Sequence, residues 1–168
     1  MCKQIRQCLD ENYSPFTGEV EIDESYFGGR KPGKRGRGAS GKTAVLGIVE
    51  RNGRIETRTI PNAKRNTILP IVTNNVSKEA NVFTDEFLAY KTLPSLGYKH
   101  DTVPHGDKIY VIGNAHTNTI EGFWGNCKNG IKGVYHSVSS DYLQNYLNEY
   151  AFRYNRRNQS SPMFFDFL

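Results

Sequence analysis

Hydrophobic and polar residues follow each other along the first third of this chain in patterns typical of β-strands. Residues 19–26 (EVEIDESY) alternate polar and apolar side chains, which predicts a strand. Residues 43–50 (TAVLGIVE) form a short apolar run that predicts a buried strand, and residues 55–60 predict the strand that returns from it. Between these two, Asn52-Gly53 favours a type I′ hairpin turn.

Helix and strand signals then alternate through the middle of the chain. A helix is predicted from residue 66 to about residue 76, with Pro70 tolerated in its first turn. Residues 81–84 predict a short strand, residues 87–93 a second helix, and residues 98–103 another strand.

The last third of the chain is predicted to be helical. An apolar stripe at helical spacing is formed by Ile120, Phe123, Trp124, Cys127 and Ile131. Ser139 is a suitable N-cap for a final helix, whose apolar face carries Tyr142, Leu143, Tyr146, Leu147, Tyr150, Ala151 and Tyr154. We expect Trp124 and these tyrosines to belong to the core rather than to a surface that stacks on nucleic-acid bases.

The predicted order of elements is β-β-β-α-β-α-β-α-α. An antiparallel start of three strands followed by α/β crossovers predicts an α/β fold with a mixed sheet and flanking helices. A ribonuclease-H-like domain has this order, although the order alone does not single that fold out.

Composition narrows the class of protein. The 168 residues suffice for one domain with a real core, and 12% aromatic residues argue against disorder. No apolar run approaches the roughly 20 residues that a bilayer span needs, and the first residues lack the apolar region of a signal peptide. We therefore expect a soluble cytoplasmic protein. Its 22 Lys and Arg against 17 Asp and Glu only hint at a polyanionic partner.

The three cysteines, Cys2, Cys8 and Cys127, are expected to be reduced thiols. Their odd number does not suit a disulfide framework. No further Cys or His pair follows Cys2 and Cys8 at the spacing of a zinc finger, so these two do not make a zinc site.

Two aspartates stand where predicted strands meet loops. Asp23 lies in the first strand and Asp85 directly follows the fourth. Because the carboxyl ends of strands in open α/β sheets face the ligand crevice, both are candidates to hold a metal or substrate. The alternative is a surface aspartate that caps a turn or a following helix.

A third carboxylate, Glu121, lies in the helix that carries Trp124. Glu121, Gly125 and Lys128 fall on one helical face, at the edge of the apolar stripe. A nucleic-acid backbone could approach closely over the glycine while Lys128 contacts a phosphate. The alternative is an ordinary solvated Glu and Lys on an amphipathic helix.

Three carboxylates suit metal-assisted phosphodiester chemistry. Two Mg²⁺ ions about 3.5–4 Å apart can activate the attacking hydroxyl and stabilise the leaving oxygen, and they prefer oxygen ligands. In this hypothesis Asp23 bridges the two ions, Asp85 holds one and Glu121 holds the other, and Mn²⁺ can replace Mg²⁺.

The order Asp23, Asp85, Glu121 and Lys128 is similar to the DDE pattern of cut-and-paste transposases. Longer strings carry a more specific resemblance: VEIDESYFGGRKPGKRGRG, VFTDEFLAY, HTNTIEGFWGNCKNGIKG and YLNEYAFRYNRR. From Gly18 to Arg157, the chain resembles the ISXO2-like transposase domain of the IS1595 insertion-sequence family.

The resemblance implies a ribonuclease-H-like fold and metal-dependent cleavage and strand transfer at transposon ends. It also implies that Asp23, Asp85 and Glu121 form the acidic triad, with Lys128 as the trailing lysine. Some members of the family have Asn in place of the Glu, so Asn118 is the alternative third ligand. Asn118 and His116 are possible accessory residues that orient water or substrate.

The basic segment 28–42 (GGRKPGKRGRGASGK) directly follows the strand that carries Asp23. We expect it to contact DNA phosphates rather than only to solubilise the surface, through Arg30, Lys31, Lys34, Arg35, Arg37 and Lys42.

Relatives in the family carry a zinc ribbon and a helix-turn-helix before this domain. We expect residues 1–17 to be the remnant of such an upstream segment and residues 18–168 to be the catalytic domain. The expected protein is a bacterial, nucleoid-associated transposase that forms a homo-oligomer on transposon-end and target DNA. The alternative is a catalytically inactive remnant that still binds DNA.

Overall fold

The computed structural model describes residue 6 and residues 14–28, 41–103 and 116–163. Along these residues the elements are β1 (Glu19–Phe27), β2 (Thr43–Glu50), β3 (Ile55–Ile60), α2 (Arg65–Asn75), β4 (Asn81–Asp85), the short 3₁₀ helix η1 (Pro94–Leu96), β5 (Lys99–Val103), α3 (Asn118–Val134) and α4 (Ser140–Asn155). The five predicted strands and the helices α2, α3 and α4 are confirmed, with bounds shifted by one or two residues.

The strands form a single mixed sheet in the order β3-β2-β1-β4-β5. Strands β1, β2 and β3 are antiparallel neighbours, whereas β4 pairs in parallel with both β1 and β5. A mixed α/β fold whose first three strands are antiparallel is therefore confirmed. Strand β1 is central and has an antiparallel neighbour on one side and a parallel neighbour on the other.

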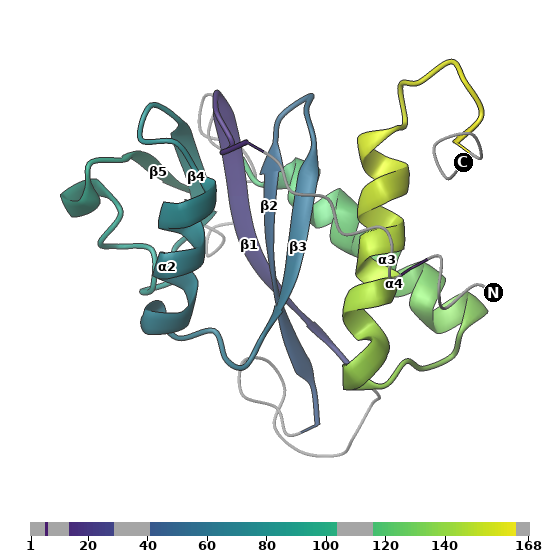
Figure 1. Cartoon of the computed structure of the whole chain (residues 1–168). Helices are drawn as coiled ribbons and strands as arrows, with labels where there is room; N and C mark the ends of the chain where they lie inside the picture. Colours follow the sequence, from purple (N-terminus) through teal and green to yellow (C-terminus); the bar gives the residue numbers. More distant parts are fainter. Residues whose placement is uncertain (1–5, 7–13, 29–40, 104–115, 164–168) are drawn as a thin grey trace.

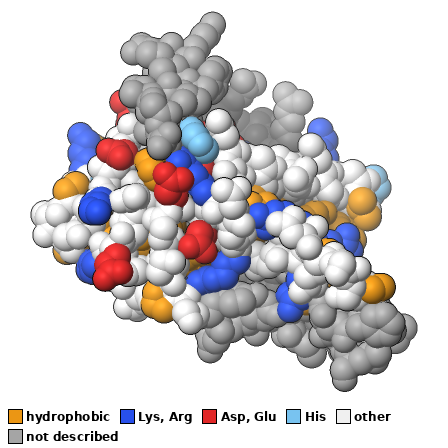
Figure 2. All heavy atoms as spheres, turned by 90° about the horizontal axis from the view of Figure 1, so that it is seen from above, with side chains coloured by type: hydrophobic (Ala, Val, Ile, Leu, Met, Phe, Trp, Pro, Cys, Tyr) orange, Lys and Arg blue, Asp and Glu red, His pale blue; other side chains and the backbone are white. Residues whose placement is uncertain are grey.

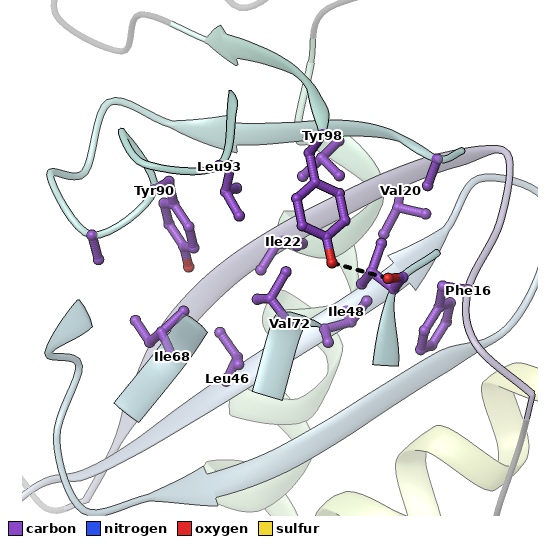
Figure 3. Close-up of a cluster of buried hydrophobic side chains, with 14 of the residues drawn as sticks. Phe16, Val20, Ile22, Leu46, Ile48, Ile68, Val72, Tyr90, Leu93 and Tyr98 are labelled. Carbon is purple, nitrogen blue, oxygen red and sulfur yellow. Dashed lines mark hydrogen bonds between the residues drawn. The ribbon is translucent and has the colours of Figure 1, made fainter. Parts of the chain in front are cut away.

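Helices cover both faces of the sheet (Figure 1). Helix α2 lies on one face, and α3 and α4 lie on the other. Alternate residues of each strand supply the two cores. On the α2 side the buried cluster includes Ile22, Leu46, Ile68, Val72 and Tyr90 (Figure 3). Tyr98 joins this cluster and donates its O–H to the Val76 carbonyl oxygen at 3.1 Å, the bond drawn in Figure 3.

The second cluster, between the sheet and helices α3 and α4, contains the predicted apolar stripe. Ile120, Phe123, Trp124 and Cys127 are buried against Val45 and Val49. The final helix contributes mainly Leu143, Leu147 and Ala151. Its tyrosines are less buried than predicted, and Tyr142 is 45% exposed, since a phenol ring can rest at the rim while its hydroxyl stays in water.

Helix α4 is also fastened to β3 at the edge of the sheet. The Ile55 N–H donates to Asn155 Oδ1 at 2.7 Å, and the Thr59 N–H donates to Gln144 Oε1 at 2.6 Å. These side chains satisfy backbone donors that an edge strand otherwise turns to solvent.

Three local predictions are wrong: the type I′ turn at Asn52-Gly53, the place of Pro70 in its helix, and the helix at residues 87–93. Asn52 has a φ of 60°, but Gly53 is not among the residues with positive φ, so the turn is not type I′, which needs positive φ at both central positions. The turn is a longer connection, closed by the Gly53 N–H donating to the Glu50 carbonyl. Helix α2 begins at Arg65, so Pro70 lies inside the helix rather than in its first turn.

The predicted helix at residues 87–93 is a run of turns. The Tyr90 N–H donates to the Phe87 carbonyl and the Leu93 N–H to the Tyr90 carbonyl, three residues back in each case. The segment lies between Asp85, whose side-chain Oδ1 accepts a hydrogen bond from the Phe87 N–H, and Pro94, which has no N–H. So few residues rarely nucleate an α-helix, and the apolar pattern is used for burial in turns instead.

Two predictions fall largely outside the described residues. Of the upstream segment 1–17, only Arg6 and residues 14–17 are described, and of the basic segment 28–42, residues 29–40 are not described. Within the described residues, no helix has the length and apolarity needed to cross a membrane.

Candidate active site

The register of the parallel pair β1–β4 brings the two aspartates into corresponding positions. The ladder pairs Val20 with Val82 and Glu21 with Phe83, and two residues further along each strand stand Asp23 and Asp85. Side chains two residues apart share a face of the sheet, so both carboxylates leave the sheet on the side covered by α3. Sequence spacing alone did not reveal this correspondence, because it depends on which strands become neighbours.

Asp23 is held by the helix packed above it. The Trp124 indole Nε1–H donates to Asp23 Oδ2 at 3.1 Å. This contact needs Gly47, the partner of Asp23 in β2, because a Cβ at residue 47 would lie 2.5 Å from Trp124 Cζ2. The glycine therefore allows the indole to approach the sheet closely enough to reach the carboxylate.

Asp85 ends β4 and organises the turn that follows. Its Oδ1 accepts the Phe87 N–H at 2.9 Å. A hollow of about 170 Å³ lies beside it, lined by Asp85, Glu86, Phe87, Lys91, His100 and Thr102. Asp85 is thus both a turn-forming residue, as the alternative interpretation held, and a carboxylate beside this hollow at the carboxyl end of β4.

Glu121 is in the first turn of α3 and is exposed. The Thr117 hydroxyl, one turn earlier, donates to Glu121 Oε1 at 2.8 Å and so restrains the side chain. Asn118 is the first residue of α3 and is exposed, and His116 lies just before the helix. His116 Nδ1 is 3.2 Å from Glu21 Oε1, so this histidine contacts a buried carboxylate of β1.

The electrostatics of Asp23 connect these carboxylates. The pKa of Asp23 is raised to about 7, first because the group is desolvated by burial and then because the negative charges of Glu24, Asp85 and Glu121 lie near it. Glu24 lies behind the site on the opposite face of β1, where its Oε2 accepts the Tyr90 O–H at 2.7 Å. A strongly raised pKa inside a cluster of acids is typical of functional sites.

Lys128 lies two turns after Glu121 on the same exposed side of α3. Desolvation lowers the pKa of its ammonium, while the nearby Asp23 carboxylate acts in the opposite direction and the Lys42 charge adds to the lowering. Asp23, Lys128 and Lys42 therefore share one electrostatic environment. The other residues predicted to bind DNA (Arg30, Lys31, Lys34, Arg35 and Arg37) lie outside the described residues.

The glycines of α3 fall into two kinds. A Cβ on Gly130 would collide with the Tyr150 hydroxyl, so that glycine is required by packing against α4. A Cβ on Gly122 or Gly125 would meet nothing within 4 Å. Since packing does not require these two, the helix has an open strip of backbone between Glu121 and Lys128.

The donor set suits a hard cation in kind, because carboxylate oxygens are what Mg²⁺ and Mn²⁺ prefer. In the conformation described, no three His, Cys, Asp or Glu side chains of the described residues come together closely enough to hold a metal ion. The carboxylates of Asp23, Asp85 and Glu121 interact through their charges rather than through a shared ligand position.

Sequence reasoning missed the residue that joins β1 to α3. Glu21 is fully buried and accepts hydrogen bonds from Arg51, Thr119 and the Ile120 N–H. It stands two residues before Asp23 and so shares its face, a parity that the alternating pattern already contained. What the pattern did not contain is that this glutamate is buried and paired.

Charged groups of both signs surround the end of the sheet where β2 turns into β3. Figure 2, which looks down on this end of Figure 1, shows red carboxylates among blue Lys or Arg side chains in the left half of the view and blue side chains without red ones in the right half. Arg51 contributes here, with Nη1 3.4 Å from Glu19 Oε2. Basic side chains without neighbouring acids therefore occupy only part of this end of the molecule in the view shown.

Comparison with known proteins gives consistent results. The ISXO2-like transposase domain family matches residues 15–155. A transposase-like protein of Haemophilus influenzae is 26% identical over 110 residues, covering 66% of this chain and 88% of that protein. A protein in the transposable element ISH50 of Halobacterium salinarum is 30% identical over 169 residues, covering 90% of this chain but only 57% of that protein. The chain thus spans little more than half the length of the archaeal relative.

Proposed function

The chain belongs to the ISXO2-like transposase domain family, and on that premise we propose that it is the catalytic domain of a DNA transposase. Its reaction would be the cleavage of transposon ends and their transfer to target DNA. Asp23, Asp85 and Glu121 would hold two Mg²⁺ or Mn²⁺ ions. The strand order β3-β2-β1-β4-β5 with flanking helices supports a ribonuclease-H-like fold for this domain.

The observation that carries this proposal is the charge cluster at Asp23. Three observations concern Asp23. The register of β1 with β4 gives it a position that corresponds to that of Asp85, its pKa is raised to about 7, and the charge of Glu121 contributes to that rise. Gathering carboxylates costs free energy unless a cation compensates for their charge. A cation site explains why a chain would keep such a cluster on the α3 side of its sheet.

The side chains that contact the carboxylates would orient them. The Trp124 indole holds one oxygen of Asp23, the Phe87 N–H holds one of Asp85, and the Thr117 hydroxyl holds one of Glu121. Restraint of one oxygen limits the rotamers of the carboxylate and directs the other. When bound, the cations would activate the attacking hydroxyl and stabilise charge on the leaving oxygen.

DNA would lie along the exposed side of α3. The open backbone at Gly125 allows a sugar-phosphate chain to approach closely, and the Lys128 and Lys42 ammonium groups would pair with its phosphates. The basic residues predicted to contact phosphates, Arg30, Lys31, Lys34, Arg35 and Arg37, would bind the same DNA. Two copies of the chain acting on paired ends would make the active form a homo-oligomer on DNA.

The test is Mn²⁺-dependent nicking or strand transfer on a short labelled duplex. Wild type should be active, Asp85→Asn should lose at least about 100-fold, and Glu79→Gln should match wild type, because Glu79 is an exposed carboxylate before the same strand. Equal activity of wild type and Asp85→Asn would refute the proposal. Metal-independent DNA binding with no cleavage by any variant would instead favour the inactive remnant.

The same assay decides the third ligand. Glu121→Gln should abolish metal-dependent activity, while Asn118→Ala should retain most of it, since Glu121, unlike the neutral Asn118, contributes to the negative charge around Asp23. The reverse result would assign that role to Asn118.

A further inference from the structure

Glu21 is a carboxylate with no access to solvent, and its side chain is fully engaged. Its Oε1 accepts Arg51 Nε–H at 2.8 Å and the Thr119 hydroxyl at 3.0 Å, and its Oε2 accepts the Ile120 N–H at 3.0 Å. A buried carboxylate is tolerated only with such partners. Three of its contacts come from segments far away in the sequence.

These contacts fasten the beginning of α3 to the first part of β1. Ile120 and Thr119 lie in the first turn of α3, directly before Glu121. Glu21 lies on the same face of β1 as Asp23, two residues earlier. Glu21 is therefore two residues from Asp23 in β1, and the Ile120 N–H that its carboxylate binds is one residue from Glu121 in α3.

Arg51, in the turn after β2, is the charged partner of Glu21. We call this ion pair, together with the contacts of Glu21 to Thr119 and Ile120, the clamp. The side chain of Arg51 is only 7% exposed, and its Nη2–H donates to the His116 carbonyl oxygen at 2.7 Å. Its guanidinium lies 4.0 Å from the centre of the Phe83 ring on β4. One ion pair thus connects β1, β4 and the chain that enters α3, the three segments that present Asp23, Asp85 and Glu121.

We propose that Glu21, with Arg51, is a positioning residue that fixes the separation of Asp23 and Glu121 for cation binding. This inference rests on the proposed function. Glu21 touches neither cation nor DNA; it acts by holding α3 in place on β1. Partners outside the direct ligands typically change metal affinity or activity by about 10–100-fold when they are removed.

The test compares Glu21→Gln with a matched structural control, Asn155→Ala. The glutamine keeps the shape of the side chain but removes the charge that pairs with Arg51. Asn155 makes a similar tie between a helix and the sheet, from α4 to β3. Mn²⁺ binding to the purified chain is measured by calorimetry, and exchange of the Ile120 amide hydrogen reports whether the start of α3 has loosened.

If the clamp positions the ligands, Glu21→Gln weakens Mn²⁺ binding about 10-fold or more and speeds exchange at Ile120, while Asn155→Ala binds Mn²⁺ as wild type does. Thr119→Val, which removes one hydrogen bond to Glu21, should give a smaller change in the same direction and serves if the glutamine variant does not fold. Folding of each variant is checked by the fluorescence of Trp124.

Glu21→Gln, or Thr119→Val in its place, with Mn²⁺ binding equal to wild type overturns the clamp and leaves the proposed function standing. An equal loss in Asn155→Ala also overturns it, since a general loss of stability would then suffice. A wild type that binds Mn²⁺ no better than Asp85→Asn overturns the proposed function itself, which is a different result.

Discussion

The sharpest prediction concerns the stability of the metal-free protein and its dependence on pH. Folding raises the pKa of Asp23 from 3.8 to about 7, so between these values the folded chain keeps a proton that the unfolded chain has released. The stability that this proton provides is complete below pH 3.8 and is lost as pH rises through 7. Metal-free wild type should therefore become less stable between pH 5 and pH 8.

The magnitude follows from the size of the shift. About 3 pKa units at 1.36 kcal/mol each set a ceiling of about 4 kcal/mol, of which roughly 3 falls above pH 5. Asp23 is only partly buried and its acidic neighbours can relax, so we expect about 2 kcal/mol between pH 5 and pH 8. Asp23→Asn removes the ionisation and retains an oxygen for the Trp124 Nε1–H, so its stability should lack this decline.

The assay is urea unfolding in EDTA at pH 5 and pH 8, followed by the fluorescence of Trp124, the only tryptophan of the chain. Glu79→Gln, which removes an exposed carboxylate, should lose as much stability between pH 5 and pH 8 as wild type does. Added Mn²⁺ should restore stability at pH 8 to wild type more than to Asp23→Asn. If the free energy of unfolding changes equally between pH 5 and pH 8 in wild type and in Asp23→Asn, Asp23 is not the group whose raised pKa causes the decline.

Four further outcomes are expected. Gly47→Ala should destabilise the fold by about 1–3 kcal/mol in urea unfolding, because its Cβ would overlap the buried indole ring; an unchanged midpoint would contradict this packing. Gly125→Ala should stabilise α3 by about 0.5–1 kcal/mol yet weaken duplex binding in an anisotropy titration, whereas Gly133→Ala, equally open, should stabilise without weakening. Lys128→Ala should reduce the slope of log binding constant against log salt by about 1, and an unaltered slope would remove Lys128 from the phosphate contacts. Burial raises the pKa of Cys127 to about 12, so its alkylation at pH 8, followed by mass spectrometry, should be far slower in the folded chain than in urea.

The strands could be predicted from the sequence because their signals are local. The alternation in residues 19–26 and the apolar run 43–50 located strands that begin and end close to where the patterns do, but the alternation did not reveal that both faces of β1 are buried, its glutamates included. The helix predicted at residues 87–93 failed because the same apolar residues can be buried in consecutive turns when the segment is short. The hydrogen bonds of Asp85 and the position of Pro94 decided between the two.

The candidate site was only partly visible in the sequence. Asp85 could be selected as a carboxylate at a strand end and Glu121 as one on an exposed helix face. Asp23, which was expected where its strand meets a loop, lies instead in the middle of β1. The role of Gly47 could not be predicted, because a glycine in a strand does not indicate which ring will lie above it. Nor could the pairing of Glu21 with Arg51 and Ile120, which are 30 and 99 positions away.

By itself the sequence determined the order of elements, the faces of each strand and helix and the family to which the chain belongs, since all of these are written in local periodicity and in strings of residues. Only the tertiary structure decided which strands are neighbours, and hence that Asp23 and Asp85 each stand two residues beyond the last paired residues of β1 and β4. It also decided that a polar position of β1, Glu21, is the most buried acid of the sheet. The physical reason is the same in each case: the cost of burying a charge depends on the partners that folding brings to it, and those partners are distant in the sequence.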